Sequence, residues 1–187
     1  MENETTTGNK SVIKAAIANF HPHDFYYFDQ TTFDGTDISR FIAYTQEDEK
    51  LILLIKNILN LFSDNLEVLV KVQKNSDKKD DWNKYFCEIS KSNLFKEIDK
   101  NTEYIIHDGS NQFYVKDPES GDYFALDDHG VFFIYSQNIK YEEILEVMNF
   151  ERNKDIAIFE KPHSHVLLSN SDELLNKMIE SFNLEEV

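Results

Sequence analysis

Two short histidine motifs carry the residue types and spacing best suited to metal chemistry. One is His-Pro-His at 21–23 and the other is His-Ser-His at 163–165. In an extended strand, residues two apart share a face, so each motif can present two imidazoles to one metal ion. A metal-dependent hydrolase is therefore an alternative, but ordinary loop histidines are the simpler interpretation and no metal ligand is assigned. A complete site would need further ligands brought near by folding, such as Asp24, His107 or His129.

Other patterns for catalysis are weak. Cys87 has aromatic and acidic neighbours, a setting for a buried thiol and not for a nucleophile of lowered pKa. The sequence has no Gly-x-Ser-x-Gly nucleophile elbow and no Gly-rich phosphate loop ahead of a Lys-Ser or Lys-Thr pair. The tetrapeptide Asp-Asp-His-Gly at 127–130 contains acid and imidazole groups, but its composition is that of a hairpin turn. We therefore predict a protein that is not an enzyme and uses no cofactor.

Negative charge is concentrated in the middle of the chain. The whole sequence has a formal net charge of −16, and residues 101–151 carry eleven acidic side chains against two basic ones. Charge of one sign steers a partner of the opposite sign, and aromatic side chains supply contact area in interfaces. We therefore expect a binding surface for a basic protein here. The aromatic residues of the same segment are Phe113, Tyr114, Tyr123, Phe124, Phe132, Phe133 and Tyr135.

Length and composition limit the class of protein. A chain of 187 residues with 41% hydrophobic residues is long enough for one domain with its own core. One cysteine excludes an internal disulfide, and no apolar run approaches the length of a membrane span. The first ten residues are polar, unlike a signal peptide, so we expect a cytoplasmic protein. The acidic balance disfavours binding to nucleic acid or to a membrane, and the oligomeric state is not predicted.

Hydrophobic periodicity predicts the elements that position these residues. After a flexible tail at 1–10, a single α+β domain is expected over 11–187. Apolar residues recur at helical spacing in five segments and alternate with polar ones in one segment. Helices are predicted at 11–20, 45–62, 81–100, 140–149 and 171–182, and strands at 25–28, 66–72, 155–160 and 164–168.

The centre of the chain predicts an antiparallel β-meander over about residues 103–135. Its strands are expected at 104–107, 112–116, 122–126 and 131–135, separated by short turns that contain Asp and Gly. Turns this short require antiparallel neighbours. Large apolar side chains occur on both faces of these strands, so the meander should pack against several helices.

The segment 109–146 resembles the strand–turn–strand–turn–helix region of bacterial immunity proteins, and in part the SUKH superfamily. The resemblance implies a small, acidic, cytosolic and non-catalytic protein that neutralises one cognate toxin domain, often a basic nuclease. Such proteins belong to contact-dependent growth inhibition and other polymorphic toxin systems. The matching positions are Gly109, 113–115, Gly121, Tyr123, Phe124, Asp128, His129 and 141–145.

These observations together predict an immunity protein that occludes the active site or substrate surface of a basic toxin domain. Folding should gather the central carboxylates into one electronegative surface, with Tyr114 or Tyr123 as an aromatic anchor. An acidic adaptor domain and a mimic of DNA remain alternatives that share this surface. The toxin's identity and the face that binds it are not predicted. The expected contact acids are Asp117, Glu119, Asp122, Asp127 and Asp128.

Overall fold

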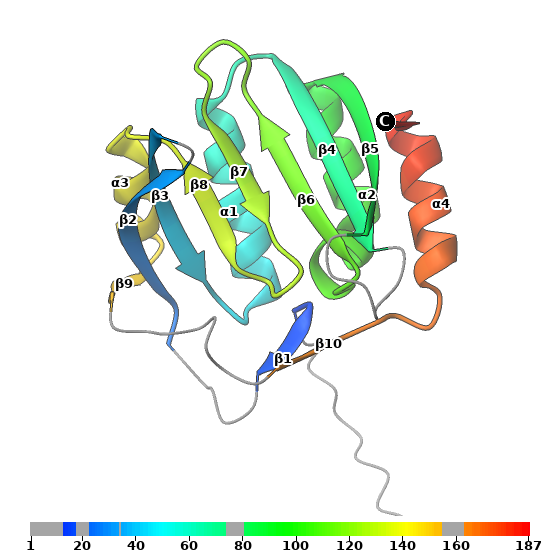
Figure 1. The fold of residues 1–187 in the computed structure, drawn as a ribbon, viewed down its shortest axis with the longest axis horizontal. Coiled ribbons are helices and arrows are strands. Elements are labelled where there is room, and N and C mark those ends of the chain that lie inside the picture. The colour runs from blue at the N-terminus through cyan, green and yellow to red at the C-terminus, as the bar shows by residue number, and fades with distance from the viewer. Residues whose placement is uncertain (1–12, 18–22, 34, 74–80, 155–162) are drawn as a thin grey trace, which may run out of the picture.

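A wide sheet covered by helices on one side forms the body of the protein in a computed structural model (Figure 1). The structure describes residues 13–17, 23–33, 35–73, 81–154 and 163–187. In these residues, nine strands form one sheet in the order β11-β5-β4-β6-β7-β8-β3-β2-β9. All neighbours are antiparallel except β2 and β9. The predicted α+β class with an antiparallel meander is confirmed.

Seven strands of three or more residues make up the main part of this sheet, and two-residue strands close its edges. The long strands are β2 (Phe25–Phe33), β3 (Thr36–Tyr44), β4 (Asn65–Gln73), β5 (Trp82–Ser90), β6 (Asn111–Lys116), β7 (Tyr123–Leu126) and β8 (Phe132–Tyr135). The edge strands are β9 (Glu151–Arg152) and β11 (Glu185–Glu186). The helices are α1 (Asp48–Leu61), α2 (Lys91–His107), α3 (Lys140–Val147) and α4 (Ser171–Phe182).

The main hydrophobic core lies between the helices and one face of the sheet. Figure 1 shows α1, α2 and α3 behind the sheet and α4 beyond β5. In β4 every second residue is buried, so one face of the strand enters the core. The helix α1 contributes one apolar stripe to the same core. The core residues of these two elements are Leu51, Leu54, Ile55, Ile58, Leu66, Val68, Val70 and Val72.

The opposite face of the sheet also carries large side chains, and no helix of the described residues covers it (Figure 1). At its β2–β3–β8 end, a second and smaller cluster buries Phe25, Ile42, Tyr44 and Phe133. Toward β4 and β5, the side chains on this face are only partly buried. We call this side the open face.

A separate two-stranded sheet lies against one end of the main sheet. It pairs β1 (Ala15–Ile17) with β10 (His163–His165) in antiparallel register. Two glycines allow its close approach. A Cβ at Gly109 would lie 2.4 Å from the backbone oxygen of Lys14, and one at Gly130 would lie 2.8 Å from Ile13. Gly130 also adopts a φ of +78°, which L side chains rarely adopt.

Three segments were predicted with the wrong type of element. The segment predicted as a helix over 81–100 is the strand β5 followed by the first part of α2. The segment predicted as a strand over 104–107 is the last turn of α2. The meander therefore has three strands, β6, β7 and β8, and β4 takes the place next to β6 that was expected for the strand at 104–107. The expected helix at 11–20 is wrong where it can be compared, because 15–17 form β1. The tail at 1–10 and the strand at 155–160 lie outside the described residues. Among those described, no helix combines the length and hydrophobicity needed to cross a membrane.

The two faces of α1 give a matched test of this architecture. Leu54 is fully buried, whereas the neighbouring Leu53 is 52% exposed. We expect Leu54→Ala to lower the free energy of unfolding by about 2–5 kcal/mol, because it leaves a cavity in the core. The matched variant Leu53→Ala should change it by less than about 0.5 kcal/mol. Urea denaturation measures both values, and equal effects would mean that α1 packs differently.

Candidate functional site

The five expected contact acids lie in two turns at opposite ends of the meander strands. Asp117, Glu119 and Asp122 belong to the turn between β6 and β7, whereas Asp127 and Asp128 belong to the turn between β7 and β8. Successive turns of an antiparallel meander are separated by the length of a strand, so the two groups cannot touch the same small area. The five acids therefore do not form one contiguous cluster.

Asp117 shapes its own turn and is 3% exposed. Its carboxylate accepts hydrogen bonds from the Ser63 backbone N–H at 3.1 Å, the Ser63 hydroxyl at 2.6 Å, the Glu119 N–H at 3.0 Å and the Ser120 hydroxyl at 2.9 Å. Burial alone would raise the pKa of this carboxyl, but the hydrogen bonds from Ser63 and Ser120 outweigh it and lower the pKa. This residue thus ties the turn to the end of α1.

The other expected acids also have internal partners, except that the Glu119 side chain has none among the described residues. Asp122 accepts a hydrogen bond from the Tyr141 hydroxyl at 2.8 Å. Asp127 accepts the backbone N–H groups of His129 at 3.0 Å and Val131 at 2.8 Å. Glu119 is exposed, so of the five it is the acid best placed to meet a partner.

The two predicted aromatic anchors do lie together, on the open face. Register places Tyr114 opposite Leu69 and Ala125, and it places Tyr123 opposite Lys116 and Tyr135. The rings of Tyr123 and Tyr135 stack with centroids 4.2 Å apart and planes 10° from parallel. We call this group the aromatic patch, and it consists of Leu69, Phe86, Tyr114, Tyr123 and Tyr135, all partly exposed.

A hollow of about 250 Å³ opens in the aromatic patch. It is lined by Leu69, Phe86, Tyr114 and Tyr123, with the ion pair of Glu67 and Lys116 on its rim, and its lining is almost wholly apolar. A larger hollow of about 740 Å³ lies at the sheet edge among β5, α2 and α4. That one is lined by more polar groups, among them Glu88, Glu97 and Glu185.

Charges on the open face are balanced. Lys116 meets Glu67 at 3.1 Å, and Arg40 meets Asp29 at 2.8 Å. The ammonium of Lys71 lies over the Tyr114 ring, 4.7 Å from its centroid. Burial and the nearby Lys84 lower the pKa of Lys71, while burial raises the pKa of Tyr123 to about 12. The patch is thus a near-neutral aromatic area on a strongly acidic protein.

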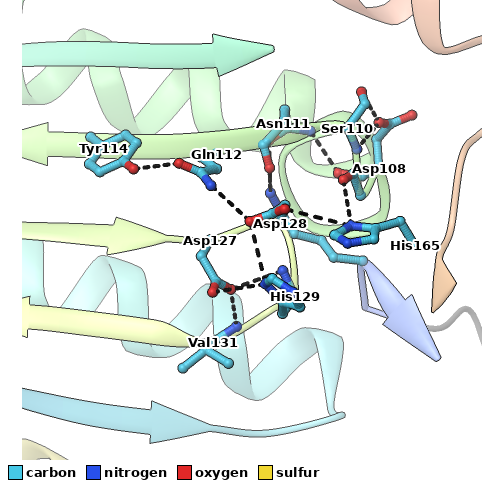
Figure 2. A network of polar contacts seen from close by, with 12 residues as sticks. Asp108, Ser110, Asn111, Gln112, Tyr114, Asp127, Asp128, His129, Val131 and His165 are labelled. Carbon is cyan, nitrogen blue, oxygen red and sulfur yellow. Dashed lines mark hydrogen bonds and ion pairs between the residues drawn. The ribbon is translucent and has the colours of Figure 1, made fainter. Parts of the chain in front are cut away.

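A second group of functional interest lies where the β1–β10 sheet meets the turn between β7 and β8 (Figure 2). We call it the polar cluster. Its residues come from four separate parts of the sequence, and each of them is either buried or only partly exposed. They are Lys14, Asp108, Asn111, Asp127, Asp128, His129 and His165.

Carboxylates surround the imidazole of His129 in the polar cluster. Its Nδ1 lies 3.2 Å from Asp127 and 3.4 Å from Asp128. These two hydrogen-bonding carboxylates raise the pKa of His129 to about 10 despite burial. For Asp128, burial acts to raise the pKa, but the hydrogen bonds from His129 and Gln112 lower it to about 2. His165 lies next to these residues. Its Nδ1 is 3.0 Å from the Gly109 carbonyl oxygen and 3.7 Å from Asp128.

Lys14 is a fully buried member of the polar cluster, and sequence reasoning missed it. Its ammonium donates to the backbone oxygen of Asn111 at 2.6 Å and to the side-chain oxygen at 2.8 Å. Burial lowers the pKa of Lys14 to about 7, against the attraction of Asp127, Asp128 and Asp108. No local motif marks this lysine, since its partners are about a hundred residues away in the chain.

The histidine motifs are only partly brought together. His165 meets His129, with ring centroids 4.9 Å apart, as a metal site built on the second motif would require. His23 is exposed, and the rest of its motif lies outside the described residues. His107 instead lies 3.3 Å from Asp48, and Asp24 forms an ion pair with Lys50. Cys87 is buried, and burial raises the pKa of its thiol to about 11, as expected for an unreactive thiol.

The role of Asp117 can be separated from that of its exposed neighbour. We expect Asp117→Ala to lower the free energy of unfolding by about 2–3 kcal/mol, because it leaves several hydrogen-bond donors without their acceptor. Glu119→Ala, in the same turn, should have an effect within about 0.5 kcal/mol. Thermal or urea denaturation distinguishes these values. If Asp117→Ala left the free energy of unfolding unchanged, Asp117 would not stabilise the turn and would again be a candidate contact residue.

The raised pKa of His129 predicts a pH-dependent contribution to stability. A histidine whose pKa rises on folding stabilises the protein fully below about pH 6.5, and this contribution is lost as the pH rises through about 10. Lys14 acts in the opposite sense over a similar range, because its pKa is lowered. The quantity to measure is therefore the difference in unfolding free energy between wild type and His129→Gln, in metal-free buffer. It should shrink between pH 6.5 and 10, whereas a constant difference would contradict the ion pairing.

Comparison with known proteins adds no relative to this description. No protein-family model matches the chain, and no match is found among curated proteins or solved structures. Function is therefore inferred from the geometry of the aromatic patch and the polar cluster.

Proposed function

We propose that the protein is a non-catalytic, cytoplasmic inhibitor of the immunity type that binds a basic toxin domain through its open face. The observation that carries this proposal is the aromatic patch with its apolar hollow. Tyrosine, phenylalanine and arginine are enriched in the energetically important centres of protein interfaces. A partly exposed group of these residues on a rigid sheet therefore favours a protein partner.

The size of the hollow favours the same class of partner. Small-molecule sites usually enclose about 300–1,000 Å³, and the hollow measures about 250 Å³ and is lined by residues of four neighbouring strands of an open sheet. A single side chain of a partner fits such a space, in the manner of an anchor residue. Nucleic acid is disfavoured because Arg40 and Lys116 are already paired with acids on this face.

Charge supports a basic partner through steering and not through a dedicated acidic patch. The chain carries a net charge of −16, and this field attracts a cationic protein from a distance. Close contact would then be made by the near-neutral aromatic patch, with Glu119 and other exposed acids at its periphery. Resemblance of the segment 109–146 to bacterial immunity proteins suggests a toxin domain as this partner.

Binding can be tested with the basic C-terminal domain of the protein encoded by the adjacent reading frame. We expect co-purification of the two proteins, and association that slows as sodium chloride is raised from 50 to 500 mM. Tyr123→Ala should weaken binding by about 2 kcal/mol or more, the scale of an interface hot spot. Leu69→Asp should weaken it further, because it places a charge in the hollow.

Leu53→Asp is the matched control for these variants. Leu53 is exposed on α1, on the side of the molecule away from the open face, so its substitution should leave binding unchanged. Isothermal titration calorimetry gives the affinities, and circular dichroism verifies that each variant is folded. Equal binding by wild type, Tyr123→Ala and Leu69→Asp would exclude the aromatic patch as the interface. Lack of any complex would argue against the proposed partner.

A further inference from the structure

Three potential metal ligands from two distant segments meet in the polar cluster. Asp128 and His129 come from the turn between β7 and β8, and His165 comes from β10 (Figure 2). One ligand atom from each of the three lies within 4.8 Å of those of the other two. From this arrangement we infer a binding site for a divalent transition-metal ion of the zinc class, held by Asp128, His129 and His165.

The donor set selects the class of ion. Two imidazoles and one carboxylate suit zinc, cobalt and nickel, whereas magnesium and calcium prefer ligand sets made of oxygen atoms. Three protein ligands leave a fourth position of a tetrahedral ion for water. Metal–ligand bonds of about 2.0–2.1 Å place tetrahedral ligand atoms roughly 3.3 Å apart, so the three groups need to close by about 1–1.5 Å at most.

The surroundings of the three residues match the second shell of a metal site. Ligating histidines usually direct their other ring nitrogen to a carboxylate or a backbone carbonyl. Here Nδ1 of His165 lies 3.0 Å from the Gly109 carbonyl oxygen, and Nδ1 of His129 lies 3.2 Å from Asp127, so Nε2 of each ring would bind the ion. Asp128 lies 3.4 and 3.7 Å from the same Nδ1 atoms and would exchange these contacts for a bond to the ion. Asp128 is itself oriented by a 2.8 Å hydrogen bond from the Gln112 side-chain amide. Each of the three ligands therefore has a partner that fixes its orientation.

Access and charge also permit a cation. The side chains of His129 and His165 are 27% and 30% exposed, so an ion can reach them from solvent. Lys14 and the protonated His129 contribute positive charge nearby, and His129 must release its proton to bind an ion. Three carboxylates, those of Asp108, Asp127 and Asp128, act on Lys14. A divalent ion would thus enter a region where negative groups are in excess. Bound there, it would fasten β10 to the main sheet.

Zinc binding to the full-length, EDTA-treated protein tests the site. We expect one equivalent of Zn²⁺ to bind and to raise the melting temperature, and Mg²⁺ or Ca²⁺ at the same concentration to have no such effect. His165→Ala and Asp128→Asn should each weaken Zn²⁺ binding at least about tenfold. His23→Ala is the matched control, because His23 is an exposed histidine of the other motif and should leave the affinity unchanged.

Spectroscopy separates this site from loose binding to surface groups. Co²⁺ in the site should give the visible absorption of a four- or five-coordinate ion with nitrogen and oxygen ligands, and this spectrum should disappear in His165→Ala. The melting temperature of each metal-free variant verifies that it folds. The inference is overturned if no stoichiometric Zn²⁺ binds, or if wild type and a folded His165→Ala bind it equally. Because the aromatic patch is tested by toxin binding, either proposal can fail without the other.

Discussion

One-sided coverage of the sheet is the constraint on which the other features depend. Side chains alternate between the two faces of a strand, so helices packed on one face bury only half of each strand's residues. The other half must face outward or find a different cover. Burial of apolar surface contributes about 25 cal/mol per Å², so leaving Leu69, Phe86 and Tyr123 partly exposed forgoes stabilisation. An antiparallel sheet with this composition on its open face is suited to a partner that completes the burial.

The acidic character of the central segment has two separate physical causes that composition cannot distinguish. Aspartates are selected in turns because their side chains accept nearby backbone N–H groups, and Asp117 and Asp127 both do so. Other acids remain in solvent and contribute only to the long-range field. The number of carboxylates in a segment therefore determines its net charge but not the position of a negative surface. This is why the turns were predicted correctly while the same residues do not form the one cluster that was expected.

Strong periodicity made much of the fold predictable. The helices α1 and α4 follow a period of 3.6 residues and the strands β4 and β6 a period of 2. The strands β7 and β8 do not alternate and were predicted from the turns that flank them. β5 was misassigned because Trp82, Tyr85, Phe86 and Ile89 have helical spacing. In the strand, Trp82 and Phe86 lie on the open face and Tyr85 and Ile89 on the covered face. A strand with apolar groups on both faces loses its alternation and imitates a helix.

The residues 104–107 show the converse error. Tyr104, Ile105 and Ile106 are consecutive and buried, which is typical of a strand, yet they form the last turn of α2. The polar cluster escaped prediction for another reason, since Lys14, Asp128 and His165 lie far apart in sequence and only the fold brings them together. The histidine motif at 163–165 did signal part of it, and His129 was among the residues considered as further ligands.

A row of hydrogen bonds connects the polar cluster to the aromatic patch. Tyr114 donates its hydroxyl proton to Gln112 at 2.5 Å, and Gln112 donates to Asp128 at 2.8 Å (Figure 2). Because Asp128 is held by His129, this row restrains Tyr114 on the open face before any partner arrives. A side chain that is already ordered loses less conformational entropy on binding than one that rotates freely. The buried charges at the end of the sheet therefore have a consequence for the surface, since they orient one of its aromatic rings.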